Sequence, residues 1–376
     1  MDSNHLMHGL AGDEVAPDWP ALAPFEVASL LRGYPQLNPG TRIEWHSSRP
    51  LSAACLVDTG AGSVFVKRHH HSVRTVITLT EEHRFIAHLR EHGMQIPAVL
   101  HDAQGQTAVR LGDWVYEVHE LASGIDLYRE AISWAPLGSI DHARQAGRTL
   151  ATLHQAAEGY AAAQRSTHIL VARSELISSA DPIATLQAQL PQRPGLAEYL
   201  RQRDWQAEFT AALTPWHTRL QPALAAQRRL WTHGDWHVSN LCWSDAGDTA
   251  RITSALDFGL AASNCALFDL ATAIERNAIA WLALDAPGAG HQPIAQALIA
   301  GYREVHPLNA DEIHLLADLL PLVHVDFALS EVEYFHAITR SPDSTDVAWN
   351  TFLLGHAHWF STATGHALLD AVRECA

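Results

Sequence analysis

The chain has 376 residues, and its 41 Asp and Glu outnumber its 25 Lys and Arg, which gives a formal net charge of −16. Proteins that bind nucleic acid without sequence preference need the opposite balance, because phosphate neutralisation drives their affinity, so a nucleic-acid partner is not expected. With 47% hydrophobic residues and 12 Trp, the chain can fill a large core, which excludes wholesale disorder, and its length suggests two or three domains.

The spacing of the cysteines indicates a reducing compartment, and the short apolar runs indicate a soluble protein. The four cysteines (Cys55, Cys242, Cys265 and Cys375) are far apart, so neither a disulfide framework nor a structural zinc site is expected. The first thirty residues lack the basic and apolar regions of a secretory signal. The run from Ala278 to Leu284 has only seven residues, well below the ~20 of a spanning helix. We therefore expect a cytoplasmic protein without a membrane partner.

The first third of the chain predicts a small lobe built on strands. Residues 1–40 are rich in Pro and Gly and are interpreted as an extension with a short helix near Phe25–Arg32. A helix is predicted from Thr80, which would cap it, to His92. Short runs of β-forming residues before and after this helix predict five antiparallel strands, at 41–45, 54–58, 63–67, 108–111 and 114–121.

Beyond Gly124 the pattern becomes mainly helical. Helices are predicted at 141–160, at 196–227 and in several pieces between 266 and 370, whereas 169–194 has no clear periodicity. A strand-turn-strand unit at 241–256 interrupts them. The prediction is an α+β protein with an extension (1–40), a small antiparallel lobe with one helix (41–121) and a larger helical lobe (122–376).

The chemistry is concentrated between Trp231 and Gly259. His233-Gly-Asp235 is followed by His237 and Asn240, then by a short hairpin that ends in Asp257-Phe-Gly. The same order of Asp, Asn and Asp-Phe-Gly occurs in kinases, where one carboxylate accepts the proton of the acceptor hydroxyl, and an amide and a second carboxylate hold magnesium. Asp235 is therefore the predicted base, and Asn240 and Asp257 are the predicted metal ligands.

This motif resembles that of the aminoglycoside phosphotransferase-like family, whose members include choline, homoserine and methylthioribose kinases. Gly147–His154 and Phe268-Asp269-Leu-Ala271 match its flanking helices, so the resemblance covers about residues 41–277. It implies a bilobal protein-kinase-like fold, Mg²⁺, ATP or GTP as co-substrate, and a small-molecule hydroxyl as acceptor. Asp269 would brace the catalytic loop, while His233 would pack within it and His237 would be structural or lie on the phosphate side.

The resemblance also assigns nucleotide contacts in the small lobe. Lys67, at the end of a strand, would bind the phosphates, and Glu82 would be its carboxylate partner, because it shares a helical face with three apolar residues. The adenine edge would bind the backbone up to Glu120 and Leu121. The loop 47–54 has no glycine, so it cannot form the glycine-rich lid of protein kinases.

The acceptor would bind in the helical lobe, with 169–194 and 324–336 as candidate segments. Glu331 and Glu333 cannot share one helical face, so one of them is expected in solvent. The tryptophans are interpreted as core residues and not as substrate platforms, with a place in the pocket wall as the alternative for Trp236, which lies beside the base. An aminoglycoside, an amino alcohol, a hydroxy amino acid and a sugar all remain open as acceptors.

Two other functions fit some of the same residues. His233, Asp235 and His237 alternate and could hold the metal of a hydrolase, although this leaves Asn240 and Asp257 unexplained. A catalytically degenerate kinase-fold binding protein is the second alternative. The triplet from His69 to His71 also suggests a metal site, but solvated or phosphate-side histidines are favoured there.

Overall fold

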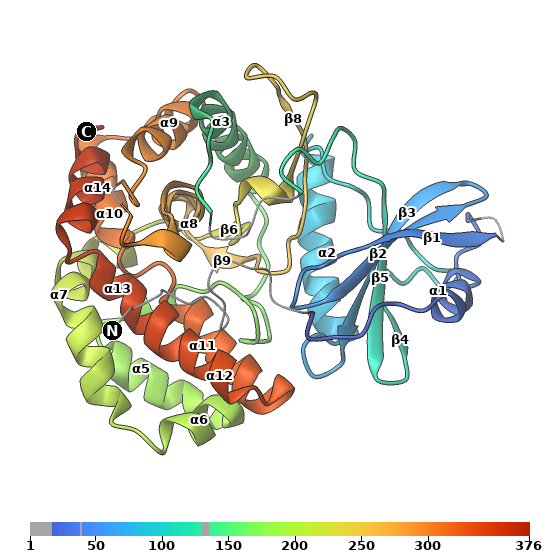
Figure 1. The fold of residues 1–376 in the computed structure, drawn as a ribbon, viewed down its shortest axis with the longest axis horizontal. Coiled ribbons are helices and arrows are strands. Elements are labelled where there is room, and N and C mark those ends of the chain that lie inside the picture. The colour runs from blue at the N-terminus through green and yellow to red at the C-terminus, as the bar shows by residue number, and fades with distance from the viewer. Residues whose placement is uncertain (1–16, 38–39, 130–134, 287) are drawn as a thin grey trace.

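The computed structural model describes residues 17–37, 40–129, 135–286 and 288–376, and it has two lobes (Figure 1). The predicted α+β fold is confirmed. The N-lobe contains a five-stranded antiparallel sheet in the order β1-β2-β3-β5-β4. Its strands are β1 (Thr41–His46), β2 (Ala53–Thr59), β3 (Gly62–His70), β4 (Val109–Leu111) and β5 (Trp114–Glu120).

Helix α2 (Val76–Glu91) packs on the face of the sheet that carries Lys67 and Glu117, which are cross-strand partners. The predicted start at Thr80 was wrong. Thr75 is the N-cap, and its hydroxyl accepts a hydrogen bond from the backbone N–H of Thr78 at 3.2 Å. The first turn was missed because residues 73–80 are rich in β-branched side chains, which favour strands over helices.

The opposite face of the sheet is covered by the N-terminal segment, which is described from residue 17 onward. Helix α1 (Pro24–Leu31) buries Val27 and Leu30 in a cluster with Cys55 and Val66 of the sheet. Upstream, the Trp19 ring stacks on His70, with 5.1 Å between the ring centroids. The described part of the predicted extension thus completes the core of the N-lobe.

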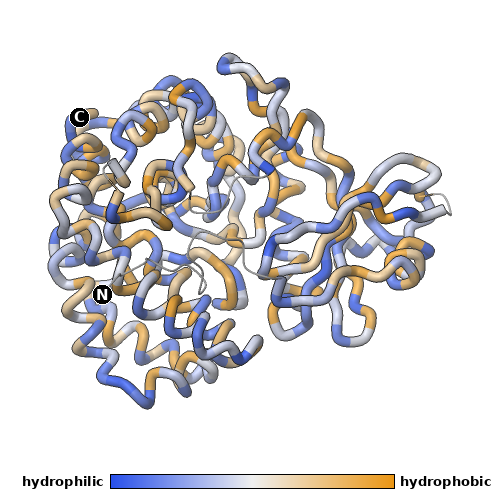
Figure 2. The backbone as a smooth tube through the Cα atoms, in the orientation of Figure 1, coloured by the Kyte–Doolittle hydropathy of each residue, from blue (hydrophilic) through white to orange (hydrophobic). Residues whose placement is uncertain are grey.

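The C-lobe is mainly helical, and Figure 2 shows hydrophobic and hydrophilic residues alternating along its helices. The predicted helix 196–227 is two helices, α6 and α7, because the polar run from Arg201 to Asp204 forms a turn between them. The irregular region 169–194 contains α4 and α5. Helices of the C-lobe are α3 (Ile140–Ala156), α4 (Glu175–Ser178), α5 (Pro182–Gln189), α6 (Pro194–Leu200), α7 (Trp205–Ala225), α8 (Ala266–Ala278), α9 (Gln292–Arg303), α10 (Ala310–Leu319), α11 (Val325–Glu333), α12 (Pro342–Asp346), α13 (His356–Trp359) and α14 (Ala363–Arg373).

Two small antiparallel pairs interrupt these helices and frame the catalytic motif. β6 (Leu230–Thr232) pairs with β9 (Ala262–Asn264), and β7 (Leu241–Trp243) pairs with β8 (Ile252–Ala255). The predicted strand-turn-strand unit is the second of these pairs. Residues 233–240 therefore form a loop that is fixed at both ends by a strand.

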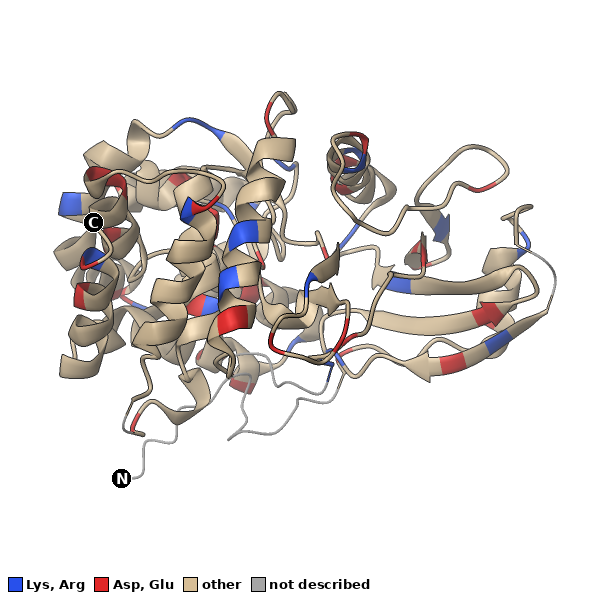
Figure 3. Cartoon of the chain, turned by 90° about the horizontal axis from the view of Figure 1, so that it is seen from above, with Lys and Arg blue, Asp and Glu red and all other residues tan. Residues whose placement is uncertain are grey.

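Charged residues of both signs are spread over the two lobes, and Figure 3 shows Lys and Arg interspersed with Asp and Glu. No helix in the described ranges is long and apolar enough to cross a membrane.

Candidate active site

Asp269, in the first turn of α8, holds the start of the catalytic loop. Its carboxylate is fully buried and accepts hydrogen bonds from the backbone N–H groups of His233 at 2.9 Å and Gly234 at 2.8 Å. Gly234 has a φ of +80°, and a Cβ there would lie 2.7 Å from the Leu260 carbonyl oxygen. Only glycine fits this position, because L-residues avoid positive φ and the added carbon has no room. The Asp269 carboxylate and the positive φ of Gly234 thus fix the backbone turn that immediately precedes Asp235.

The Asp235 carboxylate lies between an amide and a guanidinium. Asn240 Nδ2 donates to Asp235 Oδ2 at 3.1 Å and to the Asp235 carbonyl oxygen at 2.9 Å. Arg276 Nε, from the last turn of α8, lies 3.3 Å from Asp235 Oδ1. The Asp235 side chain keeps 24% of its surface exposed, so its carboxylate is accessible from solvent.

Arg276 and its neighbour Asn277 were not singled out in the sequence. Asn277 accepts from the Val238 N–H at 3.1 Å and donates to the Trp236 carbonyl oxygen at 2.7 Å, so it braces the second half of the loop. The available signal was the run Glu275-Arg276-Asn277 at the end of an otherwise apolar helix. Polar residues that are buried in such a place need partners, which here belong to the catalytic loop.

Asp257 and Lys67 join the two lobes. Lys67 Nζ on β3 lies 2.9 Å from Asp257 Oδ1, and 43% of the Asp257 side chain is exposed. Desolvation opposes ionisation of Asp257, but the Lys67 ammonium outweighs it and lowers the pKa of Asp257 to about 2. Desolvation likewise opposes the charge of Lys67, yet its pKa is raised because Asp257, Glu117 and Glu82 are close. Both groups are charged at neutral pH.

Glu82 is buried on α2, as its helical face predicted, but it does not pair with Lys67. Arg165 Nη2 lies 3.6 Å from Glu82 Oε2, and the same guanidinium donates to the carbonyl oxygens of Thr78 and Ala261. The expected Lys67–Glu82 pair is therefore replaced by Lys67–Asp257 and Arg165–Glu82. Arg165 precedes the irregular region, where no local pattern indicated its place.

The histidines of the motif occupy structural positions. His233 Nε2 bonds to the Leu256 carbonyl oxygen at 2.8 Å, and its ring packs on Phe258 with 4.6 Å between centroids. His237 Nδ1 bonds to the Ser239 hydroxyl at 2.8 Å, and burial lowers the pKa of His237 to about 4, so the ring is neutral. Within the described residues, these histidines and Asp235 do not come together as a group that could hold a metal ion.

Trp236 lies in the core and does not line a pocket. Its side chain is fully buried, and its Nε1–H donates to the Ala146 carbonyl oxygen on α3 at 3.0 Å. The interpretation of the tryptophans as core residues is confirmed for Trp236, and the alternative place in the pocket wall is not supported, because the side chain has no exposed surface.

The predicted adenine-binding backbone lies at the end of β5. The Glu120 N–H donates to the Ala98 carbonyl oxygen at 2.9 Å, and the Glu120 carboxylate accepts from the Ala98 N–H at 3.2 Å. Leu121 follows the strand with 54% of its surface exposed.

Acidic side chains from α8 and α11 gather near Arg276. Burial raises the pKa of Glu275 to about 7, although Arg276 opposes the shift. Burial also raises the pKa of Glu331 to about 8, with Arg276 opposing and Asp18, Asp235 and Glu275 adding to it. At neutral pH Glu331 is therefore mainly protonated, whereas Glu275 is near the midpoint of its titration.

The expectation that Glu331 or Glu333 would be solvated was wrong. Both are buried, and the Glu333 carboxylate lies 2.9 Å from Arg193 Nε. Every residue of α11 is buried, so this helix has no solvent face on which a charge could lie.

A model of the phosphotransferase enzyme family matches residues 49–308, which is more than half of the chain and includes the whole catalytic loop. The chain belongs to this family. Within the family it is similar to a homoserine kinase of Methylobacterium radiotolerans, at 26% identity over 65% of this chain and 66% of the relative. It is also similar to a homoserine kinase of Parvibaculum lavamentivorans, at 26% identity over 61% of each. The chain thus spans just under two thirds of the length of these relatives.

Solved structures show the same fold at low sequence identity. A microcompartment-associated aminopropanol kinase superposes with a TM-score of 0.59 at 16% identity, over 91% of this chain and 99% of the other. An amicoumacin kinase in complex with AMP-PNP, Ca²⁺ and its substrate gives a TM-score of 0.57 at 13% identity, over 88% and 94%. The similarity to these small-molecule kinases confirms the bilobal fold predicted for this chain.

Proposed function

We propose that this family member transfers the γ-phosphate of ATP or GTP to a hydroxyl group of a small molecule that also carries an amino group. The main support is a pair of contacts: the Asp235 carboxylate is bonded to the Asn240 amide, and Lys67 of the N-lobe is paired with Asp257 of the C-lobe. Phosphoryl transfer needs these groups, because its catalysis is chiefly positioning and charge stabilisation.

Asp235 is the proposed base. Asn240 and Arg276 fix the orientation of its carboxylate, which can then accept a hydrogen bond from the acceptor hydroxyl and take its proton. The pair with Asp257 keeps Lys67 protonated and aimed between the lobes, where it can contact the nucleotide phosphates.

Asn240 and Asp257 fit the magnesium ion that this chemistry uses. Asn240 directs its Nδ2 at Asp235, which leaves the opposite amide oxygen, the donor that a hard cation prefers, on the other side. Asp257 is ionised and 43% exposed. A magnesium ion held there would neutralise charge on the phosphate oxygens.

The adenine would contact the chain after β5. The Glu120 N–H is already bonded to Ala98, so the backbone of Glu120 would contribute its carbonyl oxygen, and Leu121 would contribute its exposed backbone and side chain.

Arg276 and the carboxyls around it favour a hydroxy amino acid or an amino alcohol as acceptor. The Arg276 guanidinium lies beside the base and can bind a carboxylate of the acceptor. Glu331 and Glu275 have raised pKa values, and an ammonium group nearby would let them ionise. The similarity to two proteins called homoserine kinases supports the same class of acceptor.

The test is nucleotide consumption with a panel of acceptors: homoserine, an amino alcohol, an aminoglycoside and a neutral sugar. We expect turnover of an amino-bearing acceptor and a loss of at least ~100-fold in kcat for Asp235→Asn. Asp311→Asn changes an exposed carboxylate on α10 and serves as the matched control. Full activity of Asp235→Asn would refute the proposed base, and nucleotide binding without turnover of any acceptor would favour a degenerate binding protein.

A further inference from the structure

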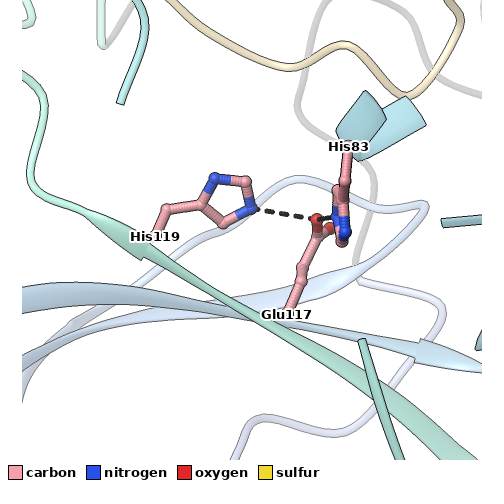
Figure 4. A group of neighbouring side chains, drawn as sticks. All are labelled: His83, Glu117 and His119. Atoms are coloured by element: carbon pink, nitrogen blue, oxygen red, sulfur yellow. Dashed lines mark hydrogen bonds and ion pairs between the residues drawn. The ribbon is translucent and has the colours of Figure 1, made fainter. Parts of the chain in front are cut away.

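His83, Glu117 and His119 meet between α2 and β5 in the N-lobe (Figure 4). One nitrogen of each ring and one carboxylate oxygen all lie within 4.8 Å of one another. Glu117 and His119 are two residues apart on β5 and therefore project from the same face of the sheet, toward His83 on α2. Glu117 and His83 are almost fully buried, and the His119 side chain is 17% exposed.

The two oxygens of Glu117 have different surroundings. Oε2 is approached by His83 Nε2 at 2.8 Å and by His119 Nε2 at 2.9 Å. Oε1 is bonded to His69 Nε2 on β3 at 2.9 Å. His69 thus fixes the carboxylate plane and leaves Oε2 facing both of the other imidazole nitrogens.

His83 is held in the same orientation from its far side. Its Nδ1 bonds to the Thr107 hydroxyl at 2.9 Å, just before β4. A metal-binding histidine usually has its second ring nitrogen hydrogen-bonded in this way, because the bond fixes the tautomer and the direction of the free nitrogen. Thr107 makes this hydrogen bond to His83, and His69 makes the corresponding one to Glu117, so both side chains are fixed in orientation.

Two imidazoles and one carboxylate are a common donor set for zinc-like ions. Tetrahedral coordination with bonds of about 2.0–2.2 Å requires donor atoms about 3.3 Å apart. The two separations from Glu117 Oε2, 2.8 and 2.9 Å, need to open by only a few tenths of an ångström, and the two imidazole nitrogens lie within 4.8 Å of each other. Imidazole-rich sites select such ions over Mg²⁺, which prefers oxygen.

We propose that His83, Glu117 and His119 bind a transition-metal dication such as Zn²⁺, through the two Nε2 atoms and Glu117 Oε2. This site is separate from Asn240 and Asp257. The bound ion would fasten α2 to β5, next to Lys67, which is the cross-strand partner of Glu117. Of the histidine triplet in the sequence, only His69 contributes, because His70 stacks on Trp19 and His71 faces the Asp113 turn.

Untagged, metal-free protein is titrated with Co²⁺ and then with Zn²⁺, without nucleotide. We expect one ion per chain, with the visible absorption of tetrahedral Co²⁺, and its replacement by Zn²⁺. Zinc should also raise the melting temperature, because the folded chain brings the three ligands together and should bind the ion more tightly than the unfolded chain does. Glu117→Gln and His119→Gln should each remove the absorption band, and nucleotide binding by the variant reports that it is folded.

Two control variants distinguish metal binding at this cluster from metal binding by other residues of the chain. Asp257→Asn removes the proposed magnesium ligand and should keep the Co²⁺ band. His92→Gln removes an exposed histidine directly after the end of α2 and should also keep the band. The proposal is overturned if the wild-type protein binds no stoichiometric Co²⁺ or Zn²⁺. It is equally overturned if folded His119→Gln retains the band, or if Asp257→Asn loses it.

Discussion

Glu331 offers a direct test of the electrostatics near the base. Its side chain is 1% exposed, and burial together with Asp18, Asp235 and Glu275 raises its pKa from the ordinary 4.5 to about 8, against the opposing effect of Arg276. The folded chain therefore holds a proton on Glu331 that the unfolded chain releases above about pH 4.5. The contribution of Glu331 to the free energy of unfolding therefore falls as the pH rises between these two values, because the native state holds the proton that the unfolded state releases.

Glu331→Gln removes this proton without changing the size of the side chain. Below pH 4.5 both proteins carry a neutral group, and their free energies of unfolding should differ by a constant amount. From there to about pH 8 the variant should gain stability relative to the wild type, by a total on the order of 3–5 kcal/mol, at about 1.4 kcal/mol for each pKa unit.

The assay is urea unfolding followed by tryptophan fluorescence at several pH values, with the same measurements on Glu91→Gln. Glu91 is exposed at the end of α2, so its substitution also replaces a carboxyl by an amide but should leave the pH dependence unaltered. A difference between wild type and Glu331→Gln that stays constant from pH 4.5 to 8 would refute the reasoning.

Three further predictions concern the loop and the acceptor. Gly234→Ala should destabilise the protein by about 1–3 kcal/mol, measured by urea unfolding, because of its φ of +80° and the nearby Leu260 oxygen; an unchanged midpoint would contradict this. Asp269→Asn should lower the free energy of unfolding by about 1.5–3 kcal/mol and also lower kcat, because the single amide oxygen cannot replace both carboxylate oxygens that accept from the loop N–H groups. Urea unfolding and steady-state kinetics measure the two effects, and wild-type values for both would contradict the prediction. Arg276→Gln should lower kcat/KM more for homoserine than for the matching amino alcohol without a carboxylate, by about tenfold for one lost charge-assisted contact; equal losses would show that Arg276 acts only through Asp235.

The sequence alone determined the family, the order of the lobes and the residue types of the catalytic loop. These depend on short spacings: Asp235 to Asn240 and the glycine at 234 are local features, and alternation and helical periodicity are visible within a few residues. Helix boundaries were less certain where local preferences conflicted, as at Thr75 and between α6 and α7.

Only the tertiary structure decided which charges meet. Arg165 pairs with Glu82, and Arg276 reaches Asp235, although each pair is far apart in the chain. Glu333 is buried because α11 is surrounded on all sides, which its own sequence does not show. The cluster at Glu117 draws its histidines from two strands and a helix, and ion pairing of this kind depends on distance in space and on burial, which no spacing along the chain encodes.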